Sequence, residues 1–250
     1  MKKYYVLGLM LTMLFVSLSL NAEDKKENAR KIDVGVLADP KFKMDWYLKR
    51  SEQYLAKLLA AGMSAEKVNA DIFLSQNKDK REQYKRIAIF YYYLFSPEMY
   101  SGMEDYVKNG GLLITNSYMN SLDMNGNYVY DKNIDKEIDG ATRLHGIDSY
   151  AAVQLQDITP KIECPLTKGL EKGQAIKCPC AMSETKGAGA TVVITGTAFR
   201  RNGQIPIKEM PVIAFKQMGN GSIIYLGPPD QEALFKNCFS NEVLEWLTNN

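Results

Sequence analysis

Three aspartates stand near predicted strand ends, where carboxylates can do acid–base chemistry. Asp39 follows the β-branched run Ile32–Leu37, Asp123 lies beyond the apolar run Leu112–Thr115, and Asp230 follows the last predicted strand. In open α/β sheets, ligands bind beyond the carboxyl ends of the strands, and two carboxylates at a suitable separation can hydrolyse a glycoside. Aspartates at such positions also form turns and cap helices. The three are therefore catalytic candidates, with turn formation as the ordinary alternative.

The sequence offers no complete pair of nucleophile and base. Ser117 also follows the run Leu112–Thr115 and is a further catalytic candidate. A serine nucleophile needs a histidine base and an oxyanion hole, and the chain has a single histidine, His145, in the stretch RLHGIDSY. A histidine beside such a turn is more simply explained by packing, so a serine hydrolase is not predicted.

No metal site and no cofactor are predicted. The segment Asp123–Asp131 begins with Asp-x-Asn-x-Asn, as calcium loops do. However, Gly126 falls one place after the second ligand position, and Ile134 stands where a closing glutamate is needed. One histidine gives little support to a histidine-based metal site. No glycine motif that could cradle a phosphate follows a predicted strand.

Four cysteines could form disulfides if the chain is exported: Cys164, Cys178, Cys180 and Cys238. They allow three pairings. Cys178 and Cys180 stand too close in sequence to pair comfortably with each other, so a bridge from Cys164 to Cys178 or to Cys180 is expected. A closed zinc site of four thiolates is the alternative, although the Cys-x-Cys spacing is unusual for one.

Aromatic residues crowd the stretch IAIFYYYLFSPEMY, which runs from Ile87 to Tyr100. Its first part, Ile87–Tyr92, predicts a strand that is buried on both faces. The alternation of side chains places Ile87, Ile89 and Tyr91 against one layer and Ala88, Phe90 and Tyr92 against the other. Ligand contacts are predicted only near the carboxyl end of this strand, at Tyr92, Tyr93 and Phe95.

The first residues have the pattern of a secretory signal. Lys2 and Lys3 precede the uncharged segment Val6–Leu20, and Ala22 offers a small residue at the cleavage position. We therefore expect a signal peptide at 1–22, a flexible charged segment at 23–31, and an exported protein in the periplasm or outside the cell. Without the two lysines, 29 basic and 29 acidic residues remain, a balance that predicts no nucleic-acid partner and no membrane association after cleavage.

The remaining residues, 32–250, are expected to form one α/β domain. Strands and helices alternate in the first half, which predicts a parallel sheet with helices on both faces. The predicted elements there are the strand Ile32–Leu37, a helix over Met44–Ala61, a strand in VNADIFLS (68–75), the strand Ile87–Tyr92, a helix that starts at Ser96-Pro97, and the strand Leu112–Thr115. The second half is richer in strands, predicted over 149–158, 190–199, 210–217 and 221–227, and closes with a helix over Asn241–Leu247.

Three segments resemble known proteins. The segment Ile87–Asn127, with Tyr-Val-x-x-Gly-Gly before a strand and an Asp-x-x-Gly loop after it, resembles the trimerisation domain of certain β-galactosidases. CPLTKGL (Cys164–Leu170) and the closing segment Pro211–Asp230 are similar to elements of trehalose-utilisation-type (ThuA-like) proteins. Both groups belong to the class I glutamine amidotransferase-like superfamily. The resemblance implies a flavodoxin-like three-layer sandwich with a mostly parallel central sheet, and by analogy a homo-oligomer.

The catalytic residues of glutamine amidotransferases are missing from this sequence. The position of their nucleophilic cysteine reads Asn116-Ser117-Tyr118, and the position of their histidine reads Pro229-Asp230-Gln231-Glu232. A thiolate and an adjacent base are both needed for that chemistry. We therefore expect an exported, non-catalytic domain with a binding or assembly role, and carbohydrate or another exported protein as its partner. The alternative is a glycoside hydrolase, or a related hydrolase, that uses the strand-end aspartates.

Overall fold

The structure is a computed structural model that describes residues 32–92, 95–116, 144–200, 203 and 205–249. One sheet of nine strands runs through it, in the order β2-β1-β3-β4-β9-β8-β7-β5-β6. The expected signal peptide and the charged segment that follows it lie outside the described residues. Three site residues predicted from the sequence also lie outside them: Tyr93, Ser117 and Asp123.

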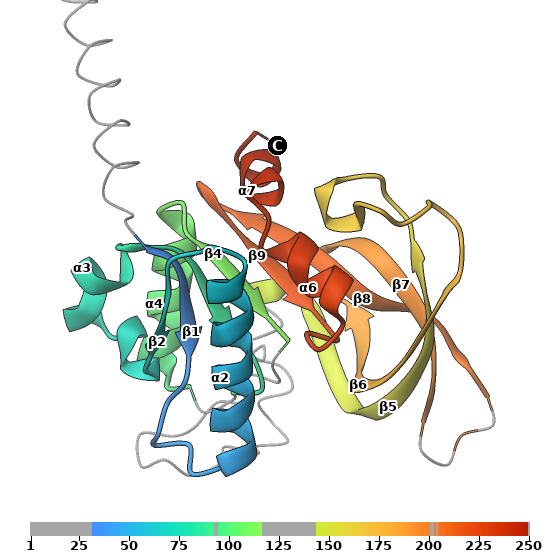
Figure 1. The fold of residues 1–250 in the computed structure, drawn as a ribbon, viewed down its shortest axis with the longest axis horizontal. Coiled ribbons are helices and arrows are strands. Elements are labelled where there is room, and N and C mark those ends of the chain that lie inside the picture. Colours follow the sequence, from blue (N-terminus) through green and yellow to red (C-terminus); the bar gives the residue numbers. More distant parts are fainter. Residues whose placement is uncertain (1–31, 93–94, 117–143, 201–202, 204, 250) are drawn as a thin grey trace, which may run out of the picture.

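The sheet has a parallel half and an antiparallel half. The strands β2 (Ala65–Val68), β1 (Ile32–Leu37), β3 (Tyr84–Ile89), β4 (Leu112–Thr115) and β9 (Gly221–Leu226) pair in parallel. The strands β8 (Ile207–Met218), β7 (Thr191–Arg200), β5 (Ile147–Pro160) and β6 (Ile176–Gly187) continue from β9 in antiparallel pairing. Figure 1 shows the second half as a strongly twisted set of long strands beside the first.

Helices cover both faces of the parallel half. One face packs against α2 (Asp45–Ala60), α6 (Glu232–Cys238) and α7 (Asn241–Thr248), and the other against α4 (Pro97–Lys108) and the short 3-10 helix η1 (Ala70–Phe73). The connecting elements are η2 (Ser75–Asn77), α3 (Lys78–Arg81) and η4 (Pro165–Thr167). Phe90 of the β3 end and Tyr54 of α2 belong to the first core, and Ile87 of β3 and Tyr106 of α4 to the second. The predicted α/β sandwich is therefore confirmed.

The sheet is mixed, whereas the sequence analysis predicted a mostly parallel one. The turn between β8 and β9 explains part of this difference. Met218 pairs with Gly221, so only two residues connect the strands, and Gly219 adopts a left-handed φ of 64°. A two-residue hairpin joins antiparallel strands, because parallel strands need a crossover of a dozen or more residues.

Two elements differ from their predictions for local reasons. The segment predicted as a strand at 68–75 forms the end of β2 and then η1, because the carboxylate of Asp39 accepts a hydrogen bond from the Ala70 N–H (3.1 Å) at the first residue of η1. The strand β6 was not predicted, since its sequence IKCPCAMSETKG is polar and half exposed. The helix start at Ser96 is as predicted: its Oγ accepts a hydrogen bond from the Met99 N–H (3.3 Å).

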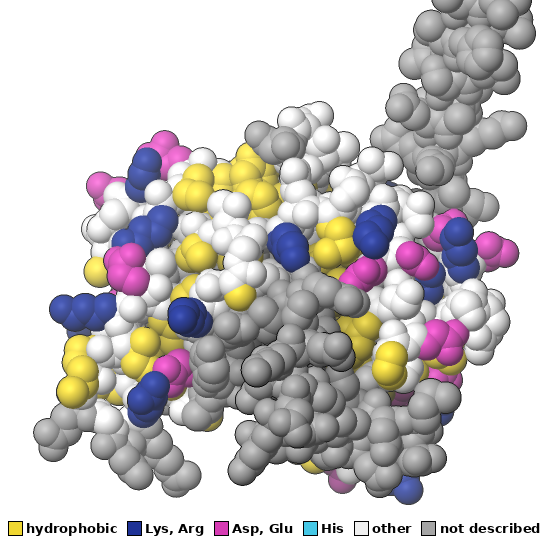
Figure 2. Space-filling view, turned by 180° about the vertical axis from the view of Figure 1, so that it is seen from behind, with side chains coloured by type: hydrophobic (Ala, Val, Ile, Leu, Met, Phe, Trp, Pro, Cys, Tyr) yellow, Lys and Arg dark blue, Asp and Glu magenta, His cyan; other side chains and the backbone are white. Residues whose placement is uncertain are grey.

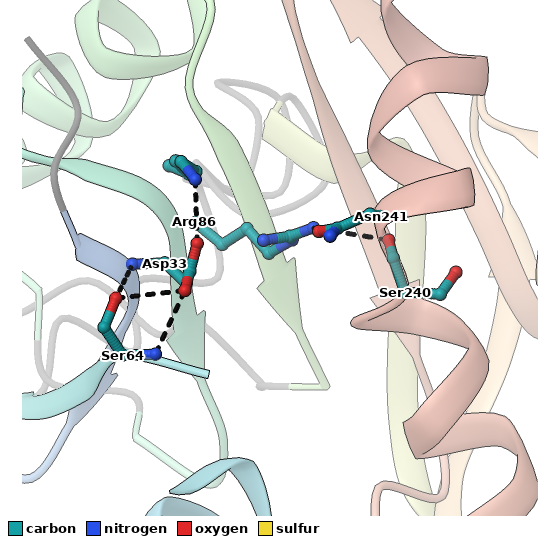
Figure 3. A network of polar contacts seen from close by, with 6 residues as sticks. Asp33, Ser64, Arg86, Ser240 and Asn241 are labelled. Carbon is teal, nitrogen blue, oxygen red and sulfur yellow. Dashed lines mark hydrogen bonds and ion pairs between the residues drawn. The ribbon is translucent and has the colours of Figure 1, made fainter. Parts of the chain in front are cut away.

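A buried arginine links the sheet to the last helix (Figure 3). Arg86 of β3 is fully buried, and its Nη2 donates to the carbonyl of Ser240 (3.3 Å) and to Oδ1 of Asn241 (3.0 Å) at the start of α7. Burial lowers the pKa of Arg86, and the nearby Asp33 opposes that effect. Asp33 in turn accepts hydrogen bonds from Ser64, through N–H and Oγ (both 3.0 Å), and from Lys85 (2.9 Å). These contacts join β1, β3 and the residue before β2.

On the face shown in Figure 2, basic side chains are interspersed with acidic ones, and hydrophobic side chains form small separate groups among the residues coloured there. Of the helices in the described ranges, none combines the length and the apolar character that crossing a membrane requires.

The carboxylate of Asp33 yields a prediction for acid stability. Its partial burial raises the pKa, but the bonds from Lys85 and Ser64 outweigh this, so the pKa lies below the ordinary 3.8. A lowered folded-state pKa adds stability above pH 3.8, and this stability is lost as the pH falls through the folded value. Asp33→Asn should lower the free energy of unfolding at pH 7 by about 1–3 kcal/mol, with a smaller loss near pH 3.

Urea unfolding at pH values between 3 and 7 measures this difference in the free energy of unfolding. Glu171→Gln, at an exposed position, is the control. An equal loss at both pH values would contradict the prediction.

Candidate functional site

Asp230 is the centre of a polar cluster at the carboxyl edge of the parallel strands. It lies between the end of β9 and the start of α6. Its Oδ1 accepts a hydrogen bond from the Tyr54 hydroxyl (2.7 Å), and its Oδ2 accepts bonds from Arg50 Nη1 and from the Tyr91 hydroxyl (3.3 Å). Three side chains from α2 and the β3 end therefore converge on one carboxylate.

The helix α2 supplies three members of this cluster from one face. Trp46, Arg50 and Tyr54 are spaced by four residues, so their side chains follow one another along the helix. The Trp46 ring meets the Tyr91 ring edge-on, with 5.9 Å between ring centres. The guanidinium of Arg50 lies 4.9 Å from the centre of the Tyr91 ring, within reach of a cation–π interaction. We refer to Trp46, Arg50, Tyr54, Tyr91 and Asp230 as the Asp230 cluster.

Tyr91 enters the cluster because its backbone is left-handed. Its φ is 58°, a conformation that costs a residue with a side chain about 1–2 kcal/mol. The buried side chain of Asn116, which follows β4, stabilises it: Oδ1 of Asn116 accepts the Tyr91 N–H (2.9 Å), and the Asn116 N–H donates to the Ile89 carbonyl (3.3 Å). Asn116 thus positions the aromatic ring of Tyr91.

The left-handed turn corrects the predicted orientation of the strand-end side chains. The alternation Ile87, Ile89 against Ala88, Phe90 is as predicted. Tyr92 was predicted to share the layer of Ala88 and Phe90, but it packs in the opposite core with Ile87 and Ile89. The strand ends at Ile89, and the φ of Tyr91 interrupts the alternation one residue before Tyr92.

Both tyrosines of the cluster remain protonated at neutral pH. Burial, and then the charge of Asp230, raise the pKa of Tyr91 to about 12. Burial and the neighbouring Tyr91 and Asp230 also raise the pKa of Tyr54. Partial burial lowers the pKa of Arg50, but Tyr91 and Asp230 outweigh that effect and leave it above its ordinary value. Asp230 therefore accepts from two neutral hydroxyls and one cation.

Asp39 has a different environment from Asp230. It is only 1% exposed, and its carboxylate accepts hydrogen bonds from the N–H of Lys41 (2.8 Å), the N–H of Ala70 (3.1 Å) and the hydroxyl of Tyr92 (3.3 Å). These bonds hold the loop after β1 against η1. The structure thus assigns Asp39 and Asp230 to two separate networks, one through Tyr92 and one through Tyr91.

The predicted aromatic ligand contacts lie in the core where the structure describes them. Tyr92 is 3% exposed and Phe95 is fully buried, with 4.9 Å between their ring centres. His145 is also buried, where Nδ1 accepts the Ile147 N–H (3.1 Å) and its ring lies against Tyr225. These side chains contribute to packing at the positions where the structure places them.

The four cysteines are free thiols in the structure, so no bridge joins Cys164 to Cys178 or Cys180. Cys178 and Cys180 are neighbours on β6, and a hydrogen bond from the Cys178 thiol holds the pKa of Cys180 below its ordinary value, against the opposing effects of burial and of Asp230. Burial raises the pKa of Cys238, and the nearby Cys164 adds to the rise. Within the described ranges, no three His, Cys, Asp or Glu side chains are grouped as a metal site would require.

Comparison with solved structures confirms the fold that the sequence resemblance implied. A β-galactosidase from Bacillus circulans sp. alkalophilus is similar with a TM-score of 0.62 and 15% identity, over 87% of this chain and 31% of that chain. A GH42 β-galactosidase from G. stearothermophilus is similar with a TM-score of 0.60 and 16% identity, over 87% of this chain and 30% of that one. This chain thus spans about a third of the length of these enzymes.

A smaller protein matches over most of its own length. A ThuA-like protein from Bacteroides uniformis is similar with a TM-score of 0.56 and 14% identity, over 84% of this chain and 90% of that chain. At these identities the similarity shows the fold alone. No family model matches the sequence, and the search of curated proteins gave no match.

Four members of the Asp230 cluster were not among the predicted site residues. The sequence held one signal for them: Trp46, Arg50 and Tyr54 recur every four residues, so a charged side chain lies between two aromatic ones along the predicted helix. An arginine in this position can pair with a carboxylate. The sequence could not show that the partner would be Asp230, which is 180 residues away.

Asn116 should control the geometry of the Asp230 cluster. Asn116→Ala leaves the Tyr91 N–H without its acceptor, which should lower the free energy of unfolding by about 1–3 kcal/mol. With Trp246→Phe in the background, Trp46 is the single tryptophan, and its emission should shift as Tyr91 moves. Asn237→Ala, which removes side-chain bonds to the carbonyls of Leu166 and Lys168, is the control and should leave Trp46 emission unchanged. An unchanged emission in Asn116→Ala would contradict this role.

Proposed function

We propose that this protein is an exported, non-catalytic domain that binds a saccharide at the Asp230 cluster. The observation that carries the proposal is an exposed tryptophan beside a partly exposed arginine–aspartate pair. Trp46 is 48% exposed, and the side chains of Arg50 and Asp230 are 40% and 50% exposed. The cluster stands at the strand edge where α/β sheets usually bind their ligands.

These groups match the two kinds of surface that a sugar ring offers. The flat ring of Trp46 can cover the apolar C–H face of a sugar, as aromatic side chains with one wet side do at interfaces. Within the described part of the chain, the hydrogen bonds of Arg50 all start from Nη1, so Nε and Nη2 remain as donors for hydroxyl oxygens. A few fixed polar groups beside aromatic ones are typical of small-molecule sites.

The absence of catalysis is supported by the states of the two described aspartates. Glycoside hydrolysis needs two carboxyl groups that flank the scissile bond. Asp39 is buried and binds Tyr92 and two backbone N–H groups, so a substrate cannot approach it without local opening. Asp230 alone is exposed at this edge among the aspartates predicted as catalytic and described by the structure.

The setting of the similar structures supports a carbohydrate ligand. Several of them are β-galactosidases, and this chain corresponds to about a third of each. The proposed export rests on the sequence of the first 22 residues and is tested by N-terminal sequencing of the protein recovered from its cells.

Saccharide binding should depend on Trp46 and Arg50. In calorimetric titrations with galactosides, mannosides and xylosides, Arg50→Ala should weaken binding about ten- to a hundredfold, since a hydrogen bond to a charged group contributes about 1.5–3 kcal/mol. Trp46→Ala should weaken binding about tenfold, because the flat aromatic surface that covers the sugar ring is lost. Arg50→Lys should be intermediate, because lysine keeps the charge but loses the planar fork. Glu52→Gln, on an exposed position of α2 that pairs with Lys67, is the matched control.

Two outcomes would overturn this proposal. If no member of a broad glycan panel binds, or if binding is unchanged in Trp46→Ala and Arg50→Ala, the Asp230 cluster is not a saccharide site. If the protein hydrolyses chromogenic glycosides and Asp230→Asn abolishes the activity, the domain is a hydrolase and the non-catalytic assignment fails.

A further inference from the structure

Three sulfur-containing side chains follow one another along one face of β6. The segment CPCAM at 178–182 places Cys178, Cys180 and Met182 at every second position, and alternate residues of a strand point to the same face. Cys178 and Met182 are buried and Cys180 is half-buried, whereas Pro179 and Ala181 between them are exposed. All three side chains therefore face the core that packs against α2, α6 and α7.

The two thiols are held against each other. The pairing of β6 with β5 shifts its register between Lys177 and Cys180, where β6 has two residues opposite one residue of β5. A bulge of this kind bends the strand and re-aims its side chains. The thiol of Cys178 donates a hydrogen bond to the sulfur of Cys180, and neither cysteine is in a disulfide. Two free thiols at hydrogen-bond distance are a ready pair of metal ligands.

The loop between β9 and α6 lies beside this group of sulfur atoms. The side-chain amide of Gln231 donates a hydrogen bond to Cys180. Met182 packs on Gly227, where a Cβ would lie 2.5 Å from its Cε and 3.4 Å from its Sδ, so the missing side chain of the glycine leaves room for the thioether. Methionine has three rotatable bonds and a polarizable sulfur, and its Sδ can turn toward an ion held by the neighbouring thiols.

The kind of ligand atom decides which metal would fit. Thiolates and thioethers are soft ligands and suit Cu(I). A structural zinc site is closed by four ligands, and within the described ranges no third His, Cys, Asp or Glu side chain joins the two thiols. Methionine sulfur is absent from the usual ligands of zinc but is a normal ligand of copper. Two thiols and one thioether therefore favour Cu(I) over zinc.

We propose that Cys178, Cys180 and Met182 bind one Cu(I) ion. The ion takes the place of both thiol protons, so two protons are released to solvent and no electron is transferred. An incoming ion meets the half-buried Cys180 first, and the buried Cys178 and Met182 then complete a site that is shielded from water. The three ligands are not members of the Asp230 cluster, so this proposal stands or fails independently of saccharide binding.

Competition with a Cu(I) chelator tests the two thiols. The full chain with Cys164→Ala and Cys238→Ala, in which Cys178 and Cys180 are the remaining cysteines, is reduced and titrated without oxygen into the coloured complex of Cu(I) with bathocuproine disulfonate. The absorbance should fall until one Cu(I) is bound per chain. Adding Cys178→Ala and Cys180→Ala should weaken Cu(I) binding about a hundredfold or more, because the ligands themselves are lost.

X-ray absorption at the copper edge tests the thioether. The spectrum of the loaded protein should show three sulfur neighbours around the ion. Met182→Leu nearly keeps the side-chain volume but removes the third ligand, so it should leave two sulfur neighbours and weaken Cu(I) binding about tenfold. Met103→Leu makes the same change at a buried position in the other core. It is the matched control and should change neither the spectrum nor the affinity.

Three results would overturn the proposal. They are a failure of the chain that keeps Cys178 and Cys180 to take Cu(I) from the chelator, an unchanged affinity when both thiols are removed, and an unchanged spectrum and affinity in Met182→Leu. Circular dichroism of each variant separates a lost ligand from a lost fold. If the variant without both thiols does not fold, the comparison of Met182→Leu with Met103→Leu still decides.

Discussion

The left-handed backbone of Tyr91 is the constraint on which the candidate site depends. A regular strand would have continued its alternation, and Tyr91 would then have pointed away from α2. Instead the turn at φ 58° brings the ring to Arg50 and Trp46 and leaves Tyr92 in the opposite core. The conformational cost is offset by the Asn116 bond and by the ring contacts. A network that holds an unfavourable backbone in place has a defined geometry, which is what a binding site needs.

The carboxyl edge of the parallel strands carries two separate hydrogen-bond networks, each centred on one aspartate. Tyr92 and Asp39 lie on one side, buried with Phe95 and Tyr47. Tyr91 and Asp230 lie on the other side, where α2 leaves Trp46 in solvent. Two adjacent tyrosines thus bind two carboxylates, the buried Asp39 that holds a loop and the partly exposed Asp230. At the opposite end of the strands, Arg86 ties β3 to the start of α7.

The first half of the fold could be predicted because its signals are local. Runs of β-branched residues, a serine cap and left-handed glycines identify β1, α4 and β4 from a few neighbouring residues. The strand β6 was not predicted, because Pro179 and the polar residues around it interrupt the alternation of apolar and polar residues that indicates a strand. The Asp230 cluster was not predicted, because its members come from three distant parts of the sequence: α2, the β3 end and the loop after β9. No property of Asp230 in sequence distinguishes it from Asp39, and only tertiary packing made one buried and the other exposed.

The free bonding capacity of the cluster argues for recognition of a ligand rather than for chemistry on it. A carboxylate has about four acceptor positions, and Asp230 uses three of them for Arg50, Tyr54 and Tyr91. Its role is to hold these donors in place. The unused capacity lies instead in the outer nitrogens of Arg50 and in the exposed ring of Trp46. Donors for hydroxyl oxygens and a flat apolar surface select a ligand by shape and hydrogen bonding, and neither transfers a proton to it.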